Sequence, residues 1–213
     1  PRVTLGPRLV EGGAEFGVWA PNVRSLAVRL GGRTVSLERE ERGVWRGFVE
    51  GAAAGDDYLL VLDDERERPD PRSRFQPHGV HGPSRLVDLG PRPAPFPVPA
   101  LKDLVFYELH CGTFTPEGTF DAAAQRLGHL ADLGVTAVEV MPVAAFPGSR
   151  GWGYDGVALY AVHAAYGGPA AFRRFVDACH AAGLAVVLDV VYNHLGPDGN
   201  YLGEFGPYFT DTA

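Results

Sequence analysis

The sequence predicts two domains in series, an antiparallel β-sandwich followed by the first part of a parallel (β/α)8 TIM barrel. Three observations predict this. Short alternating apolar runs with glycine and proline turns fill the chain before residue 90, prolines then occupy every second position from 91 to 99, and apolar runs alternate with helical patterns beyond them. A chain of 213 residues is long enough to bury a core without disulfides or a metal. We place the boundary after Pro97, which gives domains 1–97 and 98–213.

The first domain is predicted from runs of strand length at 16–20, 26–30, 44–49 and 58–62. Glycine and proline turn signals separate these runs, as in an antiparallel sandwich of the immunoglobulin type. The charged segment 63–74 is expected to form a solvated hairpin or loop. Trp19 and Trp45 lie within predicted strands, so we expect both indoles in the core.

The segment from Gly90 to Pro99 is predicted to be a stiff, extended connector. Proline fixes φ and lacks the N–H group that a central strand must donate, so this segment cannot be a central strand.

Beyond the connector, strands are predicted at 104–109, 135–141 and 185–191, with a helix between each pair. Thr119 is the predicted cap of the first helix, which ends at Gly134, and Pro169 suits the first turn of the second helix. Their predicted buried faces consist of Phe120, Leu127, Leu130 and Leu133 in the first helix and Phe172, Phe175, Val176 and Cys179 in the second. Strand, helix and strand in alternation indicate a parallel α/β sheet.

Two parallel architectures fit this alternation, a doubly wound sheet and a barrel. No G-x-G-x-x-G glycine pattern follows the first strand, because the sequence there is Cys111-Gly112-Thr113. The barrel is therefore favoured, and residues 98–213 would supply its first three βα units. The remainder of the catalytic barrel is then an expected partner of this segment.

Composition excludes several classes of function. The chain carries 19 basic and 26 acidic residues, and the acidic excess lies in residues 98–213, with 12 acidic against 5 basic side chains. Such a segment repels phosphate backbones, so no nucleic acid partner is expected. No apolar stretch approaches the ~18 residues of a membrane span, and the start lacks the pattern of a signal peptide. We expect a cytoplasmic protein that acts on a neutral substrate.

The active site of a barrel lies in the loops that follow the carboxyl ends of its strands. Those loops begin here after Leu109, Met141 and Val191. The long loop 142–168 contains Trp152 and Tyr154, which could stack on sugar rings, and Asp155, which could accept hydrogen bonds from sugar hydroxyls. Packing within an ordered loop is the alternative role for these aromatic rings.

The third loop begins with the run Asp189-Val190-Val191-Tyr192-Asn193-His194, which resembles the first signature of glycoside hydrolase family 13, the α-amylase family. Four further stretches, at 70–84, 106–120, 146–157 and 196–202, are similar to those of one group in this family, the malto-oligosyltrehalose trehalohydrolases. The resemblance covers essentially the whole chain.

This resemblance implies hydrolysis of the α-1,4-glucosidic bond adjacent to the trehalose end of maltooligosyl trehalose, with retention at the anomeric carbon. The two carboxyl groups that do this chemistry lie on the fourth and fifth barrel strands in the family, so no catalytic residue is expected in this segment. His194 resembles the imidazole that hydrogen-bonds the sugar beside the cleaved bond, and Tyr154 the aromatic platform beneath it. Trp152 and Asp155 are expected to be further substrate contacts. Asp189 and Asn193 resemble supporting residues.

Neither a cofactor nor a metal is implied. His78 and His81, which are separated by two residues, have no nearby cysteine or acidic residue at ligand spacing, which argues against a zinc site.

Two other functions fit parts of the sequence. A glycogen-branching glucosyltransferase of the same family shares the sandwich, the barrel and much of the region 189–194. The stretches 108–120 and 196–201 favour the trehalohydrolase. A third hypothesis is a non-catalytic protein whose sandwich, similar to a carbohydrate-binding module, binds α-glucan. Its support is that the catalytic carboxyl groups are missing from this segment.

Overall fold

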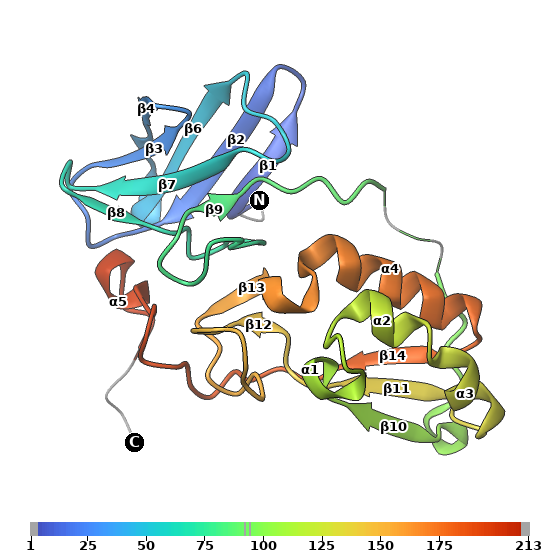
Figure 1. Ribbon diagram of the computed structural model, residues 1–213. Helices are drawn as coiled ribbons and strands as arrows, with labels where there is room; N and C mark the ends of the chain where they lie inside the picture. Colours follow the sequence, from blue (N-terminus) through green and yellow to red (C-terminus); the bar gives the residue numbers. More distant parts are fainter. Residues whose placement is uncertain (1–3, 92, 94, 210–213) are drawn as a thin grey trace.

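The computed structural model describes residues 4–91, 93 and 95–209, and its N-terminal part contains two antiparallel sheets (Figure 1). One sheet has the order β1 (Gly6–Val10), β2 (Gly13–Trp19), β6 (Val44–Glu50), β5 (Glu38–Arg39). The other has the order β4 (Arg33–Ser36), β3 (Leu26–Leu30), β7 (Asp57–Leu62), β8 (Arg66–Arg68), and β9 (Ser84–Arg85) also pairs with β7. A short 3-10 helix, η1 (Glu41–Gly43), precedes β6.

The two sheets share one apolar core. Phe16 of the first sheet and Tyr58 of the second are both buried, and their rings meet edge to face with centroids 5.1 Å apart. Trp45 is also buried, as expected, whereas Trp19 is only partly buried and its indole N–H donates to the Arg42 carbonyl. An antiparallel sandwich is therefore present, and its assignment to the immunoglobulin type stays a prediction.

The segment 63–74 contains the expected hairpin between β7 and β8, and most of its residues are partly or fully exposed, as predicted, but two are not. Asp70 and Ser73 are buried. The Asp70 carboxylate accepts hydrogen bonds from the Tyr58 hydroxyl at 2.9 Å and from the Arg72 backbone N–H at 2.7 Å. These hydrogen bonds replace the water that would surround the carboxylate in solution. Asp70 can therefore be buried although the segment around it is rich in charged residues.

The C-terminal part contains a parallel sheet of three strands in the order β10 (Phe106–Leu109), β11 (Ala137–Val140), β14 (Ala185–Leu188). Helices α2 (Phe120–Ala124), α3 (Leu127–Asp132) and α4 (Gly168–Ala181) lie on one face of it (Figure 1). The Thr119 hydroxyl accepts from the Ala122 N–H at 3.3 Å, so the predicted cap is confirmed. The short helices α1 (Cys111–Phe114), η2 (Leu101–Asp103) and η3 (Ala164–Tyr166) complete this part. The alternation of strand and helix is that of a partial TIM barrel.

Three local predictions here were wrong. The first helix is broken at residues 125–126 into α2 and α3, and Leu133, which follows α3 and precedes a turn at Gly134, is 65% exposed. The long loop contains a hairpin of β12 (Ala144–Ala145) and β13 (Ala158–Val162). The third strand ends at Leu188, and Val187 is exposed because it is the register partner of Glu139 on the face of the sheet that the helices leave uncovered.

The connector at 90–99 has neither helix nor strand at its described residues. It runs beside α4, because Arg173 donates to the Pro91 carbonyl at 2.9 Å and Phe96 stacks on His180 with centroids 4.4 Å apart. No helix of the described residues is long and apolar enough to cross a lipid bilayer.

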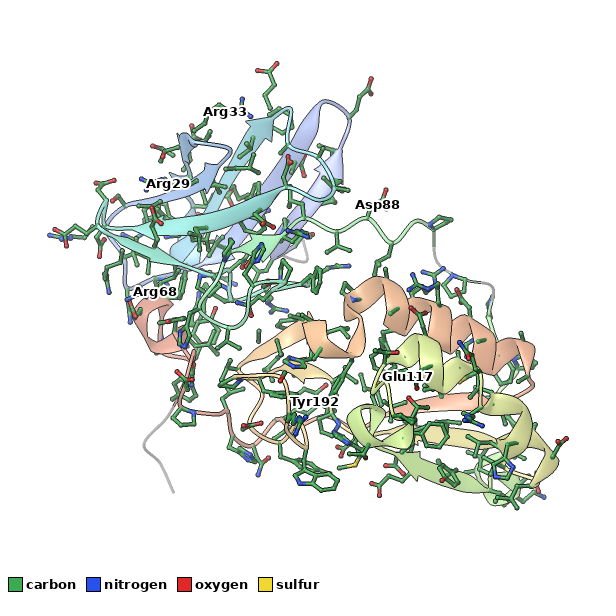
Figure 2. All side chains as sticks on the ribbon, viewed as in Figure 1. Arg29, Arg33, Arg68, Asp88, Glu117 and Tyr192 are labelled. Atoms are coloured by element: carbon green, nitrogen blue, oxygen red, sulfur yellow. The ribbon has the colours of Figure 1, made fainter. Side chains whose placement is uncertain are left out.

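The chain returns to the sandwich at its last helix, α5 (Leu202–Phe205) (Figure 1). Phe205 is fully buried in the sandwich core, and its carbonyl accepts the Asn22 N–H at 3.1 Å. The Glu204 carboxylate accepts from Arg66 and from Arg68, each at 2.9 Å. Figure 2 shows Arg68 on the side of the sandwich that faces α5. Residues of α5, which follow the parallel sheet in the chain, therefore pack into the core of the sandwich.

Candidate functional site

The carboxyl ends of the three parallel strands meet at one edge of the sheet. Leu109, Val140 and Leu188 are register partners, so the next residues of each strand, His110, Met141 and Asp189, begin three neighbouring loops. This is the edge at which barrel enzymes build their active sites. Its polar and aromatic side chains form two clusters.

The first cluster joins Tyr154, Asp189 and His194, three of the residues that the sequence predicted for the site. The Tyr154 hydroxyl donates to Asp189 Oδ2 at 3.1 Å. His194 Nε2 lies 2.8 Å from the Tyr154 carbonyl oxygen. Residues 35 and 40 positions apart in the chain are thus fixed to one another. We call these three residues the Tyr154 cluster.

Hydrogen bonding determines the tautomer of His194. A carbonyl oxygen can only accept, so His194 Nε2 carries the hydrogen and donates it to Tyr154. In the neutral ring, Nδ1 is then left as an acceptor. The imidazole is exposed, so its Nδ1 can accept a hydrogen bond from a ligand hydroxyl.

Tyr154 remains a neutral phenol at this edge. Desolvation and then the hydrogen bond to Asp189 raise the pKa of Tyr154, and the nearby carboxylates of Glu108 and Glu139 add to the effect. Sequence reasoning did not single out these two glutamates. They are register partners on β10 and β11, and the signal that could have found them is an acidic residue at the same position of two neighbouring apolar strands.

Two glycines allow the loops to approach one another. A Cβ atom on Gly196 would lie 2.2 Å from the Asp155 carbonyl oxygen, and one on Gly153 would lie 2.2 Å from the Pro142 carbonyl oxygen. Gly153 also has a φ of 88°, a backbone conformation that side chains disfavour. The Gly196 N–H donates to the Gly156 carbonyl at 3.2 Å, which joins the loop after β14 to the loop after β11.

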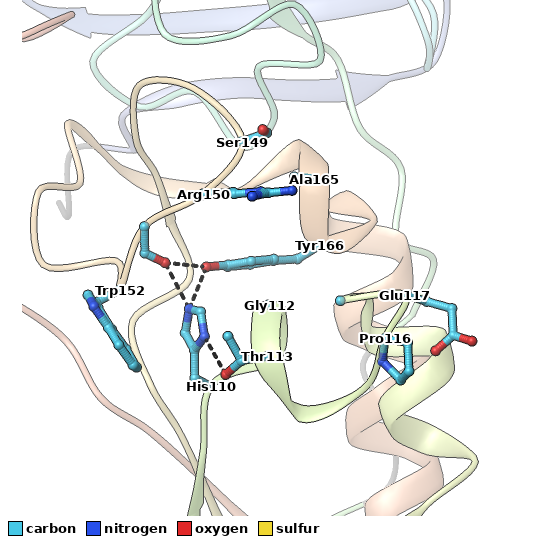
Figure 3. A pocket seen from close by; sticks show the side chains of 12 residues that line it. His110, Gly112, Thr113, Pro116, Glu117, Ser149, Arg150, Trp152, Ala165 and Tyr166 are labelled. Atoms are coloured by element: carbon cyan, nitrogen blue, oxygen red, sulfur yellow. Dashed lines mark hydrogen bonds between the residues drawn. The ribbon is translucent and has the colours of Figure 1, made fainter.

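The second cluster is centred on His110, which follows β10. Its Nε2 lies 2.8 Å from the Gly151 carbonyl and 3.0 Å from the Tyr166 hydroxyl, and its Nδ1 lies 3.0 Å from Thr113 Oγ1 (Figure 3). Trp152 packs beside His110 with ring centroids 5.1 Å apart. The structure thus groups Trp152 with His110. From the sequence, His110 is expected to be a structural residue or a substrate contact at the end of the first strand, and Tyr166 is one of the aromatic residues of the loop 142–168 that could stack on sugar. The contact between the two was not predicted.

The other two predicted site residues, Asp155 and Asn193, are exposed near the Tyr154 cluster. Asp155 follows Tyr154 directly, and Asn193 precedes His194. The predicted contact of Asp155 with substrate and the predicted supporting role of Asn193 stay predictions.

The loop after β14 is also held in place near its C-terminal end, at Asp198 and Tyr201. His81 Nδ1 contacts the Tyr201 hydroxyl at 2.5 Å, and its Nε2 lies 3.0 Å from Asp198 Oδ1. The Arg68 guanidinium lies over the Tyr201 ring at 4.6 Å. This loop therefore runs from the Tyr154 cluster directly to the sandwich. Among the described residues, no group of three or more histidine, cysteine, aspartate or glutamate side chains is arranged to hold a metal ion.

Comparisons with characterised proteins extend this description. A malto-oligosyltrehalose trehalohydrolase from Saccharolobus solfataricus is 48% identical over 98% of the chain, and a 1,4-α-glucan branching enzyme from Aromatoleum aromaticum is 32% identical over 98%. The chain spans 38% and 37% of the lengths of these relatives, respectively.

Solved structures agree with these sequence matches. A Salmonella typhimurium crystal structure described provisionally as an α-amylase has a TM-score of 0.91 at 46% identity, covering 96% of this chain and 36% of that one. A pullulanase from Anoxybacillus sp. LM18-11 complexed with maltotetraose has a TM-score of 0.78 at 26% identity, covering 92% of this chain and 35% of that one.

The family model for the α-amylase catalytic domain matches residues 69–206. The match includes the parallel sheet and all three loops of the carboxyl edge. The chain belongs to the α-amylase family.

Proposed function

We propose that this chain is the N-terminal portion of a glycoside hydrolase that cleaves the α-1,4-glucosidic bond adjacent to the trehalose end of maltooligosyl trehalose and releases trehalose. The observation that carries the proposal is the Tyr154 cluster, in which an aromatic ring, a carboxylate and an imidazole meet at the carboxyl edge of the sheet. The higher identity to a trehalohydrolase than to a branching enzyme, at equal coverage, supports hydrolysis over branching.

His194 and Tyr154 are the central substrate contacts in this proposal. Tyr154 supplies a flat ring, 42% exposed, on which a glucose residue can stack. His194 presents Nδ1 to a sugar hydroxyl, and a hydrogen bond that strengthens as charge develops lowers the barrier to bond cleavage. Trp152 and Asp155 are further contacts on the same loop.

Asp189 and Asn193 support the site instead of reacting with the substrate. One oxygen of Asp189 accepts from Tyr154, so this carboxylate fixes the orientation of the ring. A retaining mechanism needs two carboxyl groups about 5 to 5.5 Å apart, one as nucleophile and one as general acid and base. We assign neither role to a residue of this chain.

The sandwich, residues 1–97, is proposed to be an immunoglobulin-like domain that frames the site entrance, and residues 98–213 are proposed to be three βα units of the barrel. The packing of α5 on the sandwich supports this framing role. A cytoplasmic location is also proposed, in keeping with two free and buried cysteines.

Product analysis tests the proposed function. The complete protein is incubated with a trehalose-capped maltooligosaccharide and, separately, with amylose, and the products are separated by chromatography. We expect free trehalose from the first substrate. New branch points on amylose without trehalose would make the protein a glucosyltransferase, and no change in either substrate would favour the glucan-binding function.

A further inference from the structure

A second cavity opens at the outer side of the loop that carries Tyr154. Its volume is about 660 Å³, within the range of about 300 to 1,000 Å³ usual for small-molecule sites. Three segments line it: the turn at 110–118, the loop at 149–152, and Ala165 with Tyr166. Figure 3 shows Trp152 at one end and Glu117 at the other. We call this cavity the rim pocket.

The loop at 149–153 separates the rim pocket from the site already described. Ser149 to Trp152 line the rim pocket, whereas the next residue, Gly153, lines a smaller cavity of about 260 Å³ together with Asp189. A polymer that lies over Tyr154 and continues past Trp152 therefore reaches the rim pocket. A single small molecule held at the Tyr154 cluster does not extend so far.

Trp152 provides an apolar surface at the mouth of the rim pocket. The indole is 62% exposed, although its neighbour Gly151 is fixed by His110. Both ring nitrogens of His110 have hydrogen-bond partners within the protein. The ring therefore supports Trp152 and has no free nitrogen for a ligand. An exposed indole on a fixed backbone is suited to stack on a flat, partly apolar ring.

The polar groups of the rim pocket are Arg150 and Glu117, which come from opposite walls. Both side chains are exposed, and within the described part of the chain neither has an ion-pair partner. By contrast, Arg173 and Arg174 on nearby α4 pair with Asp177 and Asp121. A guanidinium fork donates to neighbouring hydroxyls and a carboxylate accepts from them. Because the two charges are opposite, the rim pocket favours a neutral polyhydroxyl ligand over an anion.

We propose that the rim pocket is a remote subsite that binds glucose residues of an α-glucan chain distant from the cleaved bond. The inference rests on the proposed function, since it assigns the rest of the same substrate. Trp152 stacks on one glucose ring, and Arg150 and Glu117 hydrogen-bond to hydroxyls of the residues that follow.

The test measures kcat/KM of the complete protein on maltooligosyl trehaloses of increasing length. Arg150→Ala and Glu117→Gln are compared with Arg126→Ala and Glu11→Gln, which alter exposed side chains outside the rim pocket. We expect each rim-pocket variant to lower kcat/KM by about fivefold to tenfold on long chains, which corresponds to a lost hydrogen bond, and to leave the shortest substrate unaffected. The control variants should leave both values unchanged.

Two results would overturn the proposal: an equal loss at every chain length, or no loss at any length. If the unsubstituted protein hydrolyses none of these substrates, the proposed function fails, and binding of maltoheptaose measured by calorimetry then tests the subsite alone. Weaker binding by Arg150→Ala than by Arg126→Ala would still support the subsite. Equal binding by the two variants would refute it.

Discussion

The two loops that form the Tyr154 cluster are held in place in different ways. The loop after β11 is fixed near Trp152 by hydrogen bonds among His110, Gly151 and Tyr166, and its hairpin packs on Val80 of the N-terminal part. The loop after β14 ends in α5, which is anchored in the sandwich by Phe205. The position of His194 therefore depends on an anchor in the sandwich core, whereas that of Trp152 depends most directly on hydrogen bonds within the C-terminal part.

The largest effect on stability is expected from removing the anchor in the sandwich. Phe205→Ala leaves a cavity where a fully buried ring was, which costs about 3 to 5 kcal/mol in the free energy of unfolding. Chemical denaturation measures it, with Phe209→Ala as the control because Phe209 is 52% exposed. Equal losses for the two variants would show that α5 is not anchored as described.

The next largest effect is expected on catalysis, at His194. His194→Ala should lower kcat/KM of the complete protein by about 10² to 10³, because it removes a hydrogen bond that strengthens in the transition state. Tyr154→Ala should also impair turnover, whereas Tyr154→Phe retains the ring and should be mild. Unchanged kinetics for His194→Ala would remove it from the site, and equal losses for the two Tyr154 variants would assign the role to the hydroxyl.

The anchor of the other loop is tested at His110. His110→Ala leaves the Gly151 carbonyl with only the Tyr166 hydroxyl, which donates to it at 3.2 Å, and should cost about 1 to 3 kcal/mol of stability. Hydrogen exchange should show greater opening at residues 149–153 and unchanged protection at 190–200. Equal loosening of both loops would contradict their separate anchoring.

A smaller effect is expected where Glu204 meets the sandwich. Glu204→Gln weakens two charge-assisted hydrogen bonds at partly exposed side chains, so the loss should be about 1 kcal/mol and should shrink as salt rises. A double-mutant cycle with Arg68→Gln isolates the coupling. Zero coupling energy would mean that the contact between Glu204 and Arg68 does not stabilise the structure.

The smallest net effect is a pH dependence in which the two parts oppose one another. His163 is buried and stacked on Phe146, and burial lowers its pKa to about 4. The unfolded chain, with a histidine pKa near 6.5, then binds a proton that the folded chain rejects, so acidification from pH 6.5 to 4 removes stability, about 2 kcal/mol by pH 5.

Asp70 in the sandwich titrates with the opposite sign. Burial raises its pKa to about 6, so the folded chain gains the proton first and stability rises as pH falls from 6 to 3.8, by about 1 kcal/mol at pH 5. Denaturation at pH 7 and pH 5 should therefore show a smaller loss for His163→Leu and a larger loss for Asp70→Asn than for the unsubstituted chain. The reverse order would contradict these assignments.

Sequence reasoning succeeded where local chemistry decides the structure. The alternation at 26–30, the cap at Thr119 and the order of strand and helix each follow from the side chains of a few neighbouring residues. The three residues of the Tyr154 cluster were chosen as site residues because the carboxyl ends of parallel strands meet at one edge and because the sequence resembles the family there. Their roles stay predictions.

The features that sequence reasoning missed depend on long-range packing. Nothing in the four residues of α5 indicates that Phe205 would enter the core of strands more than 140 positions earlier in the chain. The exposure of Leu133 follows from a break between α2 and α3 that the apolar spacing conceals. The contacts of His110 with Gly151 and Tyr166 were not predicted, because only the fold brings these residues together.

The most direct test of the account is a crystal structure of the complete protein with a bound maltooligosaccharide. We expect a glucose ring stacked on Tyr154, with one hydroxyl within hydrogen-bond distance of His194 Nδ1. A sugar bound away from both residues, with the Tyr154 cluster still formed and vacant, would contradict the assignment of this edge as the α-glucan site.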